Sequence, residues 1–132
     1  MIKLNNKGQS LILFILMFPV LILIFILVID IGNVIVLKQE LDNINNVVLD
    51  YGLDNLDMVD LDKKLDNLVK LNNNEIDSVN ILIEEDKIYI KLVENIDGMF
   101  SQFIDFSIFN VKSSFVGYID NNEKRIEKVM GD

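Results

Sequence analysis

An uninterrupted apolar run between Leu11 and Ile29 constrains this chain more than any other feature of its 132 residues. The nineteen residues of the run include no charged or hydrogen-bonding side chain, and Asp30 follows directly. As an α-helix rising about 1.5 Å per residue, the run would extend about 29 Å, close to the hydrocarbon core of about 30 Å of a typical bilayer. Each Leu, Ile, Val or Phe at the bilayer centre favours insertion by about 0.3 to 0.6 kcal/mol. The run therefore predicts a transmembrane helix, to which we assign residues 10–36.

The alternative to a membrane helix is a secretion signal that is removed from the mature protein. Such a signal has an apolar region of about 7 to 15 residues that ends in a small-x-small cleavage site. Here the run is longer, and the chain contains no alanine. Pro19 lies inside the run, where we expect a kink, because membrane helices tolerate the lost backbone hydrogen bond. The sequence thus favours a retained single-pass anchor.

Charge is distributed unevenly along the chain. Lys3 and Lys7 precede the run, whereas all 21 acidic residues lie at Asp30 or beyond, where they outnumber 10 basic residues and leave a formal charge of −11. The positive-inside rule predicts that residues 1–9 are cytoplasmic and that residues 37–132 form an extracytoplasmic domain. An acidic domain lacks the basic surface that displaces counterions from nucleic acid, so we expect no nucleic-acid partner.

The residue types limit the available chemistry. The chain has no Cys and no His, which excludes disulfides and removes the usual general base, the thiol nucleophile and the commonest zinc ligands. The sequence predicts no catalytic set, no cofactor, no metal site and no small-molecule substrate. The acidic residues between positions 54 and 66 lack the spacing of an EF-hand loop, so we interpret them as a solvated face. A tethered enzyme stays an alternative that no recognisable set of residues favours.

Asp30 has two interpretations. At the outer end of the run its carboxylate can lie in interfacial water, where burial costs much less than the about 2.5 to 3.5 kcal/mol expected at mid-bilayer. It can also form a polar contact with the membrane helix of a partner. The sequence leaves both interpretations open.

Beyond Asp30 the apolar residues narrow to one face of a helix, which we call the seam. Their spacing of 4, 3, 4 and 3 residues is typical of an amphipathic α-helix. This helix continues the membrane helix and ends near Gly52, an expected C-cap. Asp42 and Asn45 fall on the predicted wet face between the seam positions. The seam can pack on the chain's own domain or on a partner helix, and nothing in the sequence separates the two. The seam consists of Leu37, Leu41, Ile44, Val48 and Tyr51.

The next part of the chain predicts a second helix and a β-hairpin. Apolar residues recur at helical spacing between about positions 56 and 71, with Leu61, Leu65 and Leu68 on one face. In residues 79–83 and 88–92, a β-branched or other aliphatic side chain then occupies every second position on either side of a charged turn, a pattern typical of two antiparallel strands.

The last part predicts a short Phe-rich helix capped by Asp97, a third strand over residues 106–119, and a polar helix or tail over residues 121–132. The fold class is therefore α+β: one N-terminal transmembrane helix extended into an amphipathic helix, followed by a small antiparallel sheet domain.

Four local elements recur at defined spacings between residues 8 and 53. A Gly-Gln pair precedes the run, a proline lies within it, an Asp-x-Gly element ends it, and a basic-x-x-Leu-x-Asn element follows. These elements are Gly8 and Gln9, Pro19, Asp30 and Gly32, and Lys38, Leu41 and Asn43. In them the segment resembles the N-terminal segment of TadE/TadG-like proteins of the bacterial tight-adherence (Tad, or Flp) pilus assembly family.

The resemblance implies a pilin-like fold and a membrane-anchored minor pilin-like or assembly component of a pilus. Its implied partners are the lipid bilayer and other pilus or secretion-system membrane proteins. Pro19, Asp30 and Gly32 would serve helix packing in the membrane. Gly8 and Gln9 would flank a leader cleavage site as in a pseudopilin, although the position at which processed members carry glutamate is Leu13 here. The alternative is an unrelated single-pass anchored extracellular interaction domain.

Overall fold

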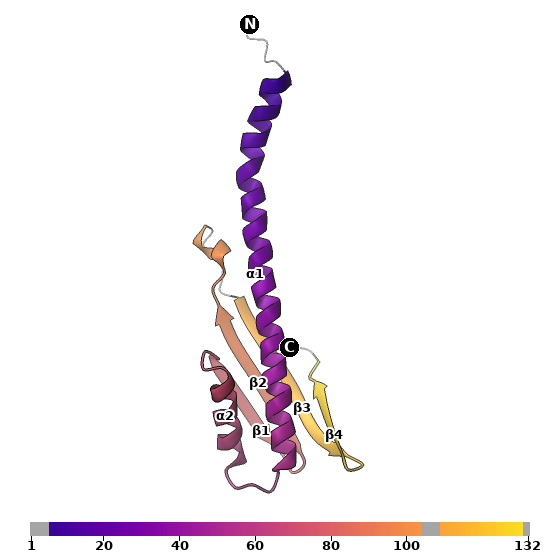
Figure 1. Ribbon diagram of the computed structural model, residues 1–132. Coiled ribbons are helices and arrows are strands. Elements are labelled where there is room, and N and C mark those ends of the chain that lie inside the picture. The colour runs from indigo at the N-terminus through magenta and orange to yellow at the C-terminus, as the bar shows by residue number, and fades with distance from the viewer. Residues whose placement is uncertain (1–5, 104–108, 131–132) are drawn as a thin grey trace.

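The computed structural model describes residues 6–103 and 109–130. It contains one very long helix, a shorter helix, a short 3-10 helix and one antiparallel sheet (Figure 1). In chain order the elements are α1 (Asn6–Asp54), α2 (Leu61–Asn72), β1 (Ser78–Ile83), β2 (Lys87–Ile96), the 3-10 helix η1 (Met99–Gln102), β3 (Phe109–Asp120) and β4 (Glu123–Lys128).

Helix α1 is continuous over 49 residues. Its N-terminal half extends beyond the rest of the molecule, and its C-terminal half lies against the sheet (Figure 1). Pro19 lies inside α1 without ending it. The prediction that an apolar helix continues directly into an amphipathic one, followed by a small antiparallel sheet, is therefore confirmed, and the fold class is α+β.

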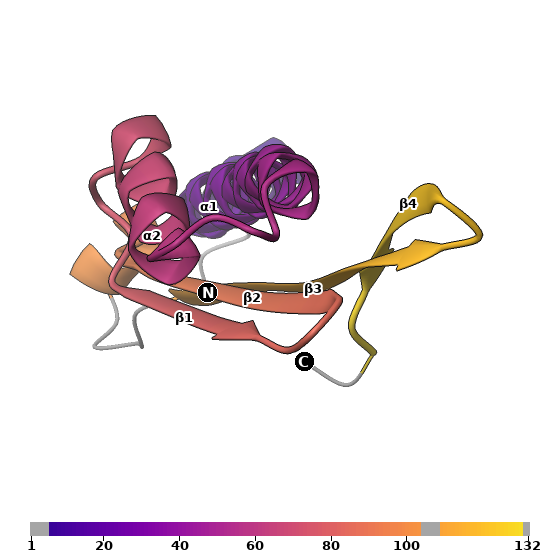
Figure 2. The same ribbon diagram turned by 90° about the horizontal axis from the view of Figure 1, so that it is seen from below.

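The four strands form one antiparallel sheet in the order β1-β2-β3-β4. The hairpin expected from residues 79–83 and 88–92 is β1 and β2, with Ile81 opposite Ile90. Both helices lie on the same face of this sheet (Figure 2). Because side chains alternate along a strand, that face receives every second residue of the central strands β2 and β3.

The core lies between this face and the two helices. Four of the five seam residues are buried there and Tyr51 is partly buried, so the seam packs on the chain's own domain. Gly52 is buried in the same layer: a Cβ added to it would lie 2.7 Å from Ile88 Cδ1. The larger core set includes Leu61, Leu65 and Val69 of α2 and Ile88, Ile90 and Leu92 of β2.

Three local predictions are wrong. Gly52 is not a C-cap: α1 continues to Asp54, and the glycine is needed for close packing of the helix on β2. Helix α2 begins at Leu61 instead of about residue 56, after Asp60 with a left-handed φ of 56°.

The third wrong prediction is the polar helix or tail at the C-terminus, where the chain forms strand β4 instead. Asn121 and Asn122 have φ values of 51° and 64° between the paired residues Asp120 and Glu123. Two successive positive φ angles are those of a type I′ turn, which joins antiparallel strands tightly and tolerates Asn. Charged residues dominate β4, as is common on an edge strand.

Candidate functional site

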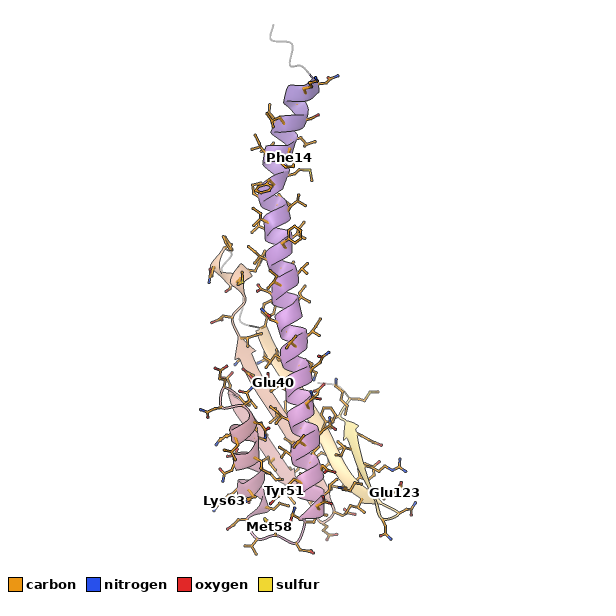
Figure 3. All side chains as sticks on the ribbon, in the orientation of Figure 1. Phe14, Glu40, Tyr51, Met58, Lys63 and Glu123 are labelled. Carbon is orange, nitrogen blue, oxygen red and sulfur yellow. The ribbon has the colours of Figure 1, made fainter. Side chains whose placement is uncertain are left out.

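The exposed part of α1 is the first component of the candidate site. None of the side chains between positions 11 and 29 is buried, and Figure 3 shows them pointing outward around the helix, Phe14 among them. By length and composition this helix is able to cross a membrane. A soluble monomer rarely exposes so large a contiguous apolar surface, so something apolar must cover it.

The second component is Asp30, at the end of the apolar run. The side chain is only 1% exposed. Its Oδ1 accepts a hydrogen bond from the backbone N–H of Met99 at 2.8 Å, and its Oδ2 accepts one from the N–H of Phe100 at 2.8 Å. The carboxylate therefore caps the N-terminus of η1 from about 70 positions earlier in the chain, where free N–H groups favour an anion.

This arrangement differs from the interpretation of Asp30 as a carboxylate in interfacial water. The side chain is buried, and both of its oxygens accept hydrogen bonds from backbone N–H groups of the same chain. A contact of Asp30 with the membrane helix of a partner stays a prediction. The expectation that Asp97 caps the short helix is also wrong: the residue before η1 is Gly98, and no side chain next to η1 in sequence caps it. Part of the predicted Phe-rich helix and of the third strand, residues 104–108, lies outside the described residues.

Gly98 allows the close approach of η1 to α1. A Cβ added to Gly98 would lie 2.5 Å from Asp30 Oδ2 and 2.8 Å from Phe109 Cε2. The clash involves a carboxylate held by two hydrogen bonds, so it cannot be relieved by a simple side-chain rotation. Asp30 and Gly98 thus act together to attach the connection between β2 and β3 to the helix.

A polar cluster with Asn45 and Ser113 at its buried centre fixes the C-terminal half of α1 on the sheet. Asn45 Nδ2 donates hydrogen bonds to the carbonyl oxygen of Ser113 at 3.1 Å, to Ser113 Oγ at 3.1 Å and to the carbonyl oxygen of Ile90 at 3.3 Å. Ser113 Oγ donates in turn to Asp42 Oδ1 at 2.6 Å. Lys38 forms an ion pair with Asp42 at 3.3 Å and donates to the carbonyl oxygen of Lys112. Polar partners in a fixed geometry define how the helix is rotated on the sheet.

The prediction that Asp42 and Asn45 belong to a wet face is therefore wrong for Asn45, which is fully buried. Asp42 is only partly exposed and accepts the hydrogen bond from Ser113. The position of Asn45 relative to its apolar neighbours nevertheless indicates burial. Asn45 lies four residues after Leu41 and four before Leu49, both of which are buried, so all three share one face of α1.

An acidic groove lies beside Asp30. Its lining includes Glu40, Asn73 and Glu94. Burial raises the pKa of Glu94; a hydrogen bond from Asn73 at 2.9 Å lowers it in part, and the charges of Glu40, Glu75 and Asp77 raise it further. Within residues 6–103 and 109–130, no group of three or more His, Cys, Asp or Glu side chains is arranged to hold a metal ion.

The remaining residues singled out from the sequence are not brought together. Gln9 and Pro19 are exposed on the protruding part of α1. A Cβ added to Gly8 or to Gly32 would meet nothing within 4 Å. Of the three residues proposed for helix packing in the membrane, Pro19, Asp30 and Gly32, Asp30 is the one that forms hydrogen bonds with a distant part of the described chain.

No protein-family model, no curated protein and no solved structure matches this chain. The resemblance to TadE/TadG-like proteins therefore rests on the residues of the N-terminal segment alone.

Proposed function

We propose that the protein is a single-pass, membrane-anchored minor pilin-like or assembly component of a Tad/Flp-type pilus, acting by helix packing and protein–protein contacts. The observation that carries this proposal is the division of α1. One half exposes a continuous apolar surface, and the other half is the spine of a small acidic α+β domain. This layout suits a subunit that is held in lipid by one end and presents a folded domain by the other.

In the proposed orientation the N-terminal end lies in the cytoplasm and the sheet domain lies outside the cell membrane. The support is the position of Lys7 and Lys3 ahead of the run and of every acidic residue behind it, since basic residues close to a membrane helix favour the cytoplasmic side.

Because the chain has no cysteine, its orientation is testable with single cysteines in the full-length protein. Val59→Cys lies at the end of the domain far from the apolar run, and Lys7→Cys lies at the basic end. We expect a membrane-impermeant maleimide to label Val59→Cys in intact cells and Lys7→Cys only after lysis. Labelling in the reverse order would refute the proposed orientation.

Gly32 supports a function in helix packing. Added Cβ atoms at Gly52, Gly98 and Gly117 would all come within about 3 Å of another residue, but one at Gly32 would meet nothing within 4 Å. The fold of one chain therefore does not need a glycine at position 32, even though glycine inside a helix costs about 1 kcal/mol relative to alanine. Small residues let a second membrane helix approach closely, and we assign this role to Gly32.

The test replaces Gly32 with leucine in the native host and measures co-purification with pilus membrane proteins. Val20→Leu, at an exposed position on a different face of the helix, is the matched control. We expect Gly32→Leu to keep its cellular level and the protease resistance of its domain while its co-purification falls about tenfold, as a lost contact of about 1.4 kcal/mol predicts. Unchanged co-purification of Gly32→Leu would remove the packing role, and the absence of any pilus component from the purified wild-type complex would refute the proposed function.

A further inference from the structure

The short helix η1 and Phe103, the residue that follows it, carry exposed apolar side chains next to the apolar part of α1. Met99 is 46% exposed and Phe103 is 63% exposed. The segment from Gly98 to Phe103 has no charged residue, although the domain as a whole is strongly acidic. Figure 1 shows η1 beyond the ends of β2 and β3, beside the middle of α1, which it contacts.

Asp30 fixes the level of η1 along the helix. The two hydrogen bonds from Met99 and Phe100 join the start of η1 to the first charged residue after the apolar run. If the run spans the hydrocarbon core, this residue marks its outer boundary. The apolar side chains of η1 then lie at the same depth, and the nearly complete burial of Asp30 keeps its charge away from the lipid.

From this juxtaposition we propose that η1 is a second membrane contact, in which Met99 and Phe103 enter the boundary between the headgroups and acyl chains of the outer leaflet. The inference rests on the proposed single membrane span. It adds a second lipid-contacting surface, which lies outside that span. Apolar side chains on an interfacial segment reach about 5–10 Å into this boundary. Lipid is the occupant that fits, because η1 continues the surface of a helix that lipid would already surround.

The consequence concerns the orientation of the domain. One helix alone leaves the domain free to tilt and to rotate about the helix axis relative to the membrane plane. A second contact, displaced sideways from α1, sets both angles. The domain would then present one constant face to neighbouring subunits.

Tryptophan fluorescence tests the proposal, because the chain has no Trp of its own. Three single-Trp variants of the full-length protein are reconstituted in phosphatidylcholine vesicles whose acyl chains carry bromine either near the headgroup or near the methyl end. Phe103→Trp reports on η1. Phe14→Trp, at a position 61% exposed on the apolar run, reports on the span. Val59→Trp, at a position 86% exposed near Met58 at the opposite end of the domain (Figure 3), is the control for water.

We expect bromine near the headgroup to quench Phe103→Trp more strongly than bromine near the methyl end. Bromine at either position should quench Phe14→Trp, which lies within the apolar run about 9 Å from its middle. Aqueous acrylamide, and not bromine, should quench Val59→Trp. Met99→Trp repeats the measurement on η1 if Phe103→Trp does not fold.

The two proposals fail in different ways. Quenching of Phe14→Trp by lipid without quenching of Phe103→Trp would overturn the η1 contact and leave the span intact. Absence of quenching in Phe14→Trp would overturn the span and the inference together. Protection of Phe103→Trp from both lipid and acrylamide would also overturn the lipid contact, since a protein surface would then cover η1.

Discussion

Replacement of Asp30 tests whether its carboxylate attaches η1 to α1. Both carboxylate oxygens accept backbone N–H groups at 2.8 Å. Hydrogen bonds to a charged group contribute about 1.5–3 kcal/mol each. The side chain of asparagine has one acceptor oxygen and one NH₂ group. The NH₂ group would face the N–H of Met99 or Phe100, which is itself a donor, so no hydrogen bond could form there. Asp30→Asn therefore loses at least one bond, and Asp30→Ala loses both.

The loss should appear as local opening of the chain around η1. A loss of about 1.5–3 kcal/mol corresponds to an increase of about 10- to 140-fold in the population of the opened state. Amide hydrogen exchange of the full-length protein in micelles measures this population at Met99 and Phe100, which are the bonded amides. We expect exchange there to be faster in Asp30→Asn and faster still in Asp30→Ala.

The matched control is Asp97→Asn, which makes the same change in charge at an exposed position just before η1. It should leave exchange at Met99 and Phe100 within about twofold of the wild type, because surface changes seldom exceed about 0.5 kcal/mol. Unchanged exchange in Asp30→Asn would refute the attachment. So would an equal acceleration over the whole of β3, because the domain as a whole would then have opened.

Three further substitutions test the packing of α1 on the sheet, each read as a thermal unfolding midpoint in micelles. Gly52→Ala should lower stability by up to about 2 kcal/mol, because overpacking costs about 1–3 kcal/mol and outweighs the gain of about 1 kcal/mol in helix propensity; Gly32→Ala, which meets no neighbour, should not lower it. Asn45→Ala should destabilise by about 1–3 kcal/mol, because it removes the only side chain that binds both β2 and β3 carbonyl groups in the described core, whereas the exposed Asn43→Ala should change stability by less than about 0.5 kcal/mol. Glu94→Gln should stabilise the protein at neutral pH, because the pKa of Glu94 is raised in the folded state. The contribution of Glu94 to stability is complete below the ordinary pKa of a glutamate and is lost as the pH rises through the pKa of the folded state. The advantage of Glu94→Gln should therefore shrink in acid, and an advantage that stayed constant with pH would contradict this assignment.

The sequence predicts those parts of the fold in which apolar residues recur at a regular spacing within one helix or strand. The spacing of Leu37, Leu41, Ile44 and Val48 fixes the buried face of α1, because neighbours three and four residues apart share one side of a helix. The alternation in residues 79–83 likewise predicts β1, because every second side chain of a strand faces the core. In both cases the information lies within a few residues.

The parts that the sequence does not predict depend on partners far along the chain or on turn chemistry. Nothing near Asp30 in the sequence indicates a bond to amides about 70 residues later, since the packing of β2 beside α1 is what brings Met99 close to Asp30. Strand β4 lacks an alternating apolar pattern. The feature of the sequence that indicates β4 is the Asn121–Asn122 turn, which is hard to recognise inside a segment of mostly polar residues.

Polar contacts join α1 to the rest of the domain at several points along its length. The Asn45 cluster joins the helix to the middle of the sheet, and Asp30 joins it to η1 at the end of the apolar run. Lys124 of β4 also forms ion pairs with Asp50 and Asp54 near the C-terminal end of the helix. A load applied to the domain of an anchored subunit would therefore reach α1 at several levels instead of one. If the seam alone held α1, the helix could shift along the sheet more easily, because the burial of apolar surface has little directional preference. Hydrogen bonds of fixed geometry resist such sliding, which is the property required of a subunit whose proposed function is to hold a constant position among its neighbours.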